Sequence, residues 1–193
     1  PRRMKTELTY QLSGEWGAFF DPVQDYCREL AETVEQQEQQ GGARLIWYAT
    51  LALLRCVASS PAAAVKALTT RLEGTVRDEA LLGDERLHDG EADDRSGSDL
   101  EPPAQVQDAA PRLQALIADA QRLSGKAGDP KLAALIRHID LLVKDGYHPV
   151  VFCRYIDTAH YLAAALQGKF KSATVKAVTG ELTPDEREAA VPA

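Results

Sequence analysis

The side chains with the clearest chemical potential lie near the C-terminus. Arg154 directly follows an apolar run, and Thr179-Gly180 ends a second one. A guanidinium group, a hydroxyl group and the backbone amides of a loop are the groups with which proteins commonly hold phosphate oxygens. These residues therefore indicate contact with a phosphate backbone. Further positive charge comes from Lys169, Lys171 and Lys176.

Each of these residues also has a purely structural interpretation. Arg154 can form an ion pair with Asp157, and Thr179-Gly180 can be an ordinary turn. Arg187 can pair with an acidic neighbour on a helix surface. The spacing alone does not choose between these interpretations and phosphate contact.

The sequence lacks the common motifs for nucleotide binding, nucleophilic catalysis and metal binding. The segment that comes closest to a phosphate-binding loop, Ser124 to Ala127, lacks both the earlier glycine and the hydroxyl residue after lysine. No serine stands in a nucleophile elbow. Cys153 follows an apolar run, but a nucleophilic role would need a placed histidine. The histidines are scattered and the cysteines have no metal-ligand spacing; they are His88, His138, His148, His160, Cys27, Cys56 and Cys153.

The elements that position the phosphate-contacting residues are predicted to be strands and helices in alternation. The apolar run 149–153 is typical of a strand buried on both faces of a parallel sheet. Asp157 can cap the following helix, and 172–179 is interpreted as a second strand. Thr183 and Glu186 form a capping box around Pro184, which starts another helix. This order predicts a right-handed βαβ crossover.

The same residues carry a resemblance to superfamily II helicases, with the Swi/Snf-like bacterial DNA-dependent ATPases as the nearest group. In this family a sequence motif ends the first strand, and Phe152 and Cys153 match it. A second family motif, a glycine with an arginine seven residues later, follows the next strand and is matched by Gly180 and Arg187. The remaining matched residues are Asp157, Thr158 and Lys131, the last in an Asp-x-Lys-Leu segment. The stretch 53–64, which contains Ser59-Ser60-Pro61, resembles a helical insertion of the same family.

The resemblance implies an α/β fold, with a mostly helical N-terminal part followed by a partial RecA-like parallel βαβ lobe. It implies a helical connector over 1–88, an acidic flexible linker over 89–110 and the partial second lobe over 111–193. The parent protein would be an ATP-dependent DNA helicase or translocase that binds ATP and Mg²⁺ between two lobes. Contacts with DNA are then expected from Arg154, Thr179, Gly180 and Lys131. No catalytic residue, metal ligand or bound cofactor is expected in this chain alone.

Composition limits the other possibilities. The chain has 193 residues and a formal net charge of -7, which argues against nucleic-acid binding over the whole surface. Its longest apolar run, 45–54, is too short to cross a bilayer, so no membrane partner is expected. The three separated cysteines indicate free thiols in a reducing cytoplasm.

The chain starts at Pro1 and lacks the phosphate loop, so we expect a fragment that cannot hydrolyse ATP without the missing first helicase lobe. Uncovered sheet edges would then favour self-association of the truncated lobe. The alternative is a stand-alone helical interaction module without nucleotide chemistry.

Overall fold

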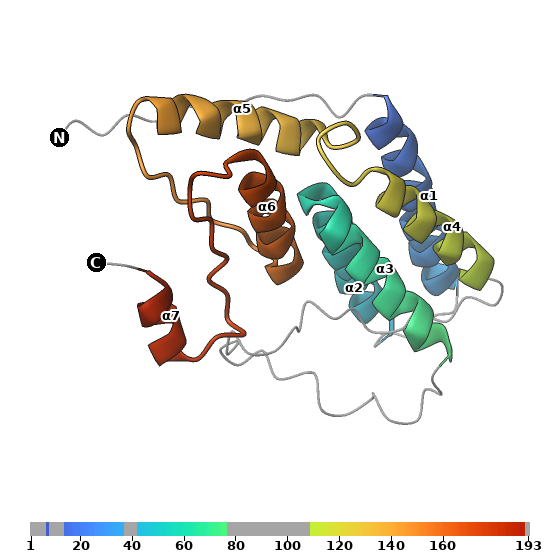
Figure 1. Cartoon of the computed structure of the whole chain (residues 1–193). Helices are drawn as coiled ribbons and strands as arrows, with labels where there is room; N and C mark the ends of the chain where they lie inside the picture. The colour runs from blue at the N-terminus through green and yellow to red at the C-terminus, as the bar shows by residue number, and fades with distance from the viewer. Residues whose placement is uncertain (1–6, 8–13, 37–41, 77–108, 192–193) are drawn as a thin grey trace.

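Seven helices make up the regular structure of the residues that the computed structural model describes, namely 7, 14–36, 42–76 and 109–191 (Figure 1). Four of them surround the larger core. Their bounds are Glu15–Gln36 (α1), Gly42–Ser59 (α2), Pro61–Val76 (α3) and Ala109–Arg122 (α4). The other three are Pro130–Lys144 (α5), Ile156–Lys169 (α6) and Pro184–Ala190 (α7).

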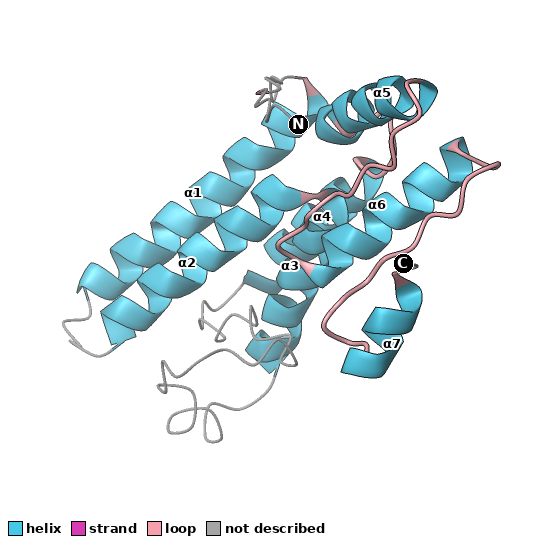
Figure 2. Ribbon diagram, turned by 90° about the vertical axis from the view of Figure 1, so that its left-hand side faces the viewer, coloured by secondary structure: helices cyan, strands magenta, loops and turns pink. Residues whose placement is uncertain are grey.

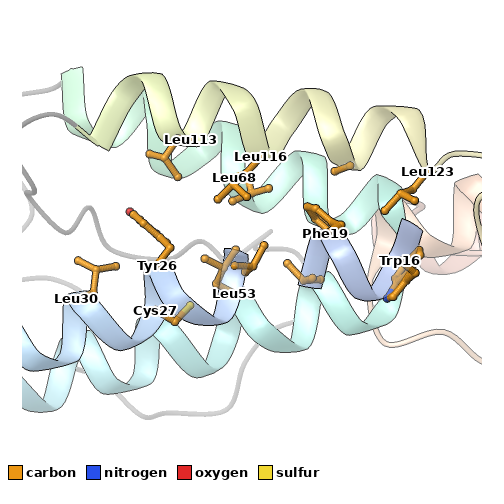
Figure 3. Close-up of a cluster of buried hydrophobic side chains, with 14 residues drawn as sticks. Trp16, Phe19, Tyr26, Cys27, Leu30, Leu53, Leu68, Leu113, Leu116 and Leu123 are labelled. Carbon is orange, nitrogen blue, oxygen red and sulfur yellow. The ribbon is translucent and has the colours of Figure 1, made fainter. Parts of the chain in front are cut away.

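The four-helix bundle forms because each helix carries an apolar stripe at helical spacing. On α1 the stripe recurs at Trp16, Phe19 and Val23, and on α4 at Leu113 and Leu116; all five side chains are buried. Helices α1, α2, α3 and α4 pack against one another around this core, as Figure 3 shows. The bundle thus joins α4 to helices that precede it by more than thirty residues.

A second and smaller core lies between α5 and α6. Leu132, Ile136 and Ile139 of α5 pack against Leu166 of α6. The chain after α6 also covers this core, since Val175 packs against it. Contacts between the two cores pass through α3 and α6, and through a third cluster of Cys56, Ala63 and Tyr155.

The prediction of a partial RecA-like βαβ lobe is wrong. The described part of the chain contains no strand: the predicted strands 149–153 and 172–179 are loop segments before and after α6 (Figure 2). Both segments have strand-like sequences, and the helix predicted between them forms as α6. A sheet requires a hydrogen-bonded neighbour as well as a suitable sequence. No backbone hydrogen bond joins these two segments among the described residues.

The sequence signal for a helix start at Asp21-Pro22, an N-cap residue type before proline, is misleading: α1 begins at Glu15 and contains Pro22 in its interior. Proline there removes one backbone hydrogen bond from the helix. The burial of Trp16 and Phe19, whose rings meet edge to face, keeps the earlier turns helical. The predicted acidic linker, 89–110, lies outside the described residues except for its last two positions.

None of the described helices has both the length and the apolar content needed to cross a bilayer.

Leu53 and Leu51 allow a test of the larger core within one helix. Leu53 is 0% exposed and Leu51 is 42% exposed, and both lie on α2. Leu53→Ala leaves a cavity and should lower the free energy of unfolding by about 2–5 kcal/mol. Leu51→Ala should cost less than about 1 kcal/mol. Urea unfolding followed by circular dichroism measures both, and equal losses would contradict this packing.

Candidate functional site

A pocket of about 280 Å³ lies where the α2–α3 junction meets the start of α5, the loop before α6 and α6 itself. Its lining combines apolar side chains with two basic residues, one acidic residue, three hydroxyl groups and one thiol. The residues important here are Ser59, Ser60, Asp129, Lys131, Leu132, Val151, Phe152, Cys153, Arg154, Thr158 and Leu162.

Asp129 fixes one wall of this pocket. Its Oδ1 accepts hydrogen bonds from the backbone N–H groups of Lys131 (2.9 Å) and Leu132 (3.0 Å), which caps α5. Its Oδ2 accepts one from the Tyr161 hydroxyl at 3.1 Å. The same hydroxyl accepts from the backbone N–H of Gly125 at 3.0 Å, so α5, α6 and the preceding loop are tied together. Burial raises the pKa of Tyr161, which keeps its hydroxyl protonated as a donor.

Lys131 reaches from α5 to the C-terminal end of α2. Its Nζ donates to the backbone carbonyl oxygens of Ala58 (2.7 Å) and Ser59 (2.8 Å). A cation is favourable there, because the last carbonyl groups of a helix lack partners within the helix and carry partial negative charge. Burial lowers the pKa of Lys131, and nearby Asp129 opposes that shift. Lys131 thus joins the two cores, and DNA contact by this residue stays a prediction.

A cluster of three hydroxyl groups forms the second connection between the cores. Thr158 Oγ1 lies 2.9 Å from Ser59 Oγ and 2.8 Å from Ser60 Oγ. Ser60 Oγ also accepts from the backbone N–H of Ala63 at 3.1 Å, which caps the start of α3. Because Ser60 and Thr158 are both buried, these hydrogen bonds replace those that water would otherwise provide.

Arg154 lies at the rim of the pocket with an exposed side chain. Its guanidinium carbon is 5.8 Å from the centroid of the Tyr155 ring. The ion pair with Asp157 that the sequence left open does not occur among the described residues. Asp157 lies in the first turn of α6, whose N-cap is Tyr155, so the predicted cap by Asp157 is wrong. The positive charge of Arg154 is therefore accessible to a ligand.

Thr179 and Gly180 lie beside α6, away from the residues that line the pocket. Thr179 is buried, and its hydroxyl donates to Glu181 Oε2 at 3.3 Å. The same carboxylate oxygen lies 2.8 Å from Nε2 of His160, in the second turn of α6. The hydrogen bond from His160 lowers the pKa of Glu181. Thr179 thus forms the turn that the sequence left open, and its contact with phosphate stays a prediction.

The remaining predicted residues fall into two groups. Phe152, Cys153 and Thr158 line the pocket, and burial raises the pKa of the Cys153 thiol. Arg187 lies in α7, where the predicted capping box forms between Thr183 and Glu186. Residues of α7 do not line the pocket, so Arg187 is not brought to it.

Ser59 and Ser60 are the site residues whose partner the sequence did not indicate. Their contact with Thr158 spans almost one hundred residues, so no local pattern predicts it. No cluster of potential metal ligands occurs in the described ranges. No protein-family model, curated protein or solved structure matches this chain.

Lys131→Met should lower the free energy of unfolding by about 1–3 kcal/mol at neutral pH, because two carbonyl groups lose a charged donor. Since the pKa is lowered by folding, the unfolded chain binds more protons between that pKa and the ordinary value of 10.5. Wild-type stability, relative to the variant, should therefore rise with pH through this window. Urea unfolding at several pH values measures it, with Lys126→Met as the exposed control. A pH-independent difference would contradict the lowered pKa.

Thr158→Val keeps the shape of the side chain but removes the shared hydroxyl. It should lower the free energy of unfolding by about 1–2 kcal/mol, because Ser59 and Ser60 lose a hydrogen-bond partner in a buried place. Thr174→Val, at an exposed position, is the matched control. If both variants lose the same stability in urea, the hydroxyl cluster contributes nothing specific.

Proposed function

We propose that this chain is part of an ATP-dependent DNA translocase and contributes contacts with the DNA backbone. The role of Arg154 would be to hold a phosphate oxygen through its guanidinium group. ATP and Mg²⁺ would bind largely to a companion motor lobe, which this chain would contact. The chain by itself is not proposed to be an ATPase. We place it in a reducing cytoplasm, which suits its three free cysteines.

The observation that supports this proposal is the meeting of three sequence motifs at one pocket. Ser59-Ser60, Asp129-Lys131 and Cys153-Arg154 are distant in sequence, and each belongs to a separate stretch that resembles the same family. All six residues line the pocket. A common location is expected if the three motifs serve one surface, whereas unrelated similarities would have no reason to converge.

The charge distribution also suits a local contact. The chain carries a net charge of -7, so most of its surface repels phosphate. A phosphate contact therefore needs a basic side chain that is not neutralised by an acidic neighbour. Arg154 is exposed, and no described acidic group lies within ion-pair distance of it. Such a residue gives a sequence-independent contact that weakens as salt concentration rises.

A second candidate function is a helical protein-interaction module. Trp47, Tyr48 and Leu51 are exposed and, from their spacing, lie close together on α2. Exposed aromatic groups of this kind favour a protein partner. This alternative requires no contact with DNA, so DNA binding discriminates between the two candidates.

Fluorescence anisotropy with a labelled DNA duplex tests the first proposal. Wild-type chain should bind in low salt, and Arg154→Ala should weaken binding. The slope of log affinity against log salt should become shallower by about 0.9, the value for one phosphate contact. Arg137→Ala removes an exposed arginine from α5 and is the charge-matched control. Absence of DNA binding, or equal effects of both variants, would favour the interaction module.

A further inference from the structure

Phe152 is the most exposed large apolar side chain in the described part of the chain, and it lines the pocket beside the α2–α3 junction. It is 95% exposed, and its neighbour Val151, which also lines the pocket, is 36% exposed. Leu132, Leu135 and Leu162 add further apolar surface to the lining. A hollow apolar surface with an exposed aromatic ring at its opening is typical of a ligand-binding groove.

Most polar groups in the wall of this pocket already have partners within the protein. Both carboxylate oxygens of Asp129 accept hydrogen bonds, and Lys131 donates to two carbonyl groups at the end of α2. The hydroxyl groups of Ser59, Ser60 and Thr158 form one cluster. A sugar or another ligand rich in hydroxyl groups would therefore lose its hydrogen bonds with water and gain few in return. The wall favours a ligand whose body is apolar.

The charge at the rim favours an anion. Arg154 lines the pocket with an exposed side chain, and no described acidic group lies within ion-pair distance of it. Asp129 is the acidic residue of the lining, but its carboxylate caps α5, so a cationic ligand would gain little from it. A guanidinium group binds a carboxylate through two parallel hydrogen bonds. One exposed guanidinium group thus suits a ligand with one carboxylate.

The size of the pocket limits the apolar body of the ligand. An apolar cavity of about 150 Å³ can hold benzene. This pocket has a volume of about 280 Å³, which corresponds to a chain of about six to ten carbon atoms. A longer chain would extend past Phe152 into water and gain little from its additional methylene groups.

We propose that this pocket binds a medium-chain monocarboxylate. The chain lies against Leu132, Leu135 and Leu162, Phe152 covers it from the solvent side, and the carboxylate pairs with Arg154. Binding removes the apolar surface of Phe152 from water, which accounts for an aromatic ring exposed at this place. Arg154 pairs with one anion at a time, so the bound ligand excludes DNA phosphate from this residue. Binding of the carboxylate itself does not depend on any contact with DNA.

Isothermal titration calorimetry with octanoate tests the proposal. The wild-type chain should bind, and each methylene group removed, towards hexanoate and butanoate, should weaken the affinity by about threefold to fourfold. Octanol keeps the chain without the charge, and inorganic phosphate keeps a charge without the chain. Both should bind at least about tenfold more weakly than octanoate. An affinity that does not depend on chain length, or equal binding of octanol, would overturn the proposal.

Two matched pairs of variants test the side chains. Phe152→Ser removes an apolar group that lines the pocket, whereas Val150→Ser removes a 75% exposed one that does not. Arg154→Gln removes the cation at the rim, and Arg137→Gln removes an exposed arginine from α5. The first variant of each pair should weaken octanoate binding by about tenfold, and the second by less than about twofold. All four side chains are exposed, so the variants should fold, which circular dichroism can verify. Equal effects within either pair would contradict the site.

Alkylation of Cys153 locates the bound ligand. This thiol lines the pocket and is partly exposed, whereas Cys27 and Cys56 are buried. Iodoacetamide transfers its acetamide group to the thiolate sulfur and releases iodide. Octanoate at ten times its Kd should slow this reaction about tenfold, as measured by mass spectrometry of the Cys153 peptide. Butanoate at the same concentration should protect much less. Octanoate binding without protection of Cys153 would place the ligand elsewhere and overturn the proposal.

Discussion

The contact between the Lys131 ammonium group and the end of α2 is the interaction on which the arrangement of the molecule depends. The two larger cores are separate, one among α1 to α4 and one between α5 and α6. They meet through the small cluster around Tyr155 and through the polar contacts of Lys131 and Thr158. Apolar clusters of this size tolerate many orientations, whereas charged and hydroxyl hydrogen bonds require particular distances and directions. The polar contacts therefore select one orientation.

This junction also places Arg154. The residue precedes α6, and Thr158 in the first turn of that helix is held by Ser59 and Ser60. A change in the bundle that moves the α2–α3 junction would consequently move the rim of the pocket. The position of Arg154, the residue proposed to contact DNA, therefore depends on the four-helix bundle, although no residue of the bundle is itself proposed to contact phosphate.

The loop before α6 both lines the pocket and carries exposed apolar side chains. Val151, Phe152 and Cys153 line the pocket, and Val150 and Phe152 are the most exposed apolar side chains of the segment. The same short segment ends at Arg154, so it also forms the rim that is proposed to contact DNA.

Local sequence signals identified much of the helical structure and failed where partners were needed. The caps of α5 and α7 follow local signals, since the side chains of Asp129 and Thr183 accept hydrogen bonds from backbone N–H groups two or three residues ahead. The apolar spacing within α4 and α6, and the Ser59-Ser60-Pro61 cap before α3, are likewise local signals of helices. Asp21-Pro22 is a local signal of a helix start, yet α1 begins at Glu15, because the burial of Trp16 and Phe19 keeps the residues before the proline helical.

The sequence by itself determined most of the helical segments, since caps and apolar spacing depend on neighbours within a few positions. Tertiary structure alone decided that segments 149–153 and 172–179 are not paired, because a strand is completed by hydrogen bonds from another segment. It likewise decided that Thr179 is buried. It also decided that Lys131 and Thr158 join two cores, a role that depends on contacts across about seventy to one hundred residues. Such contacts arise from the packing of whole helices, which no local pattern records.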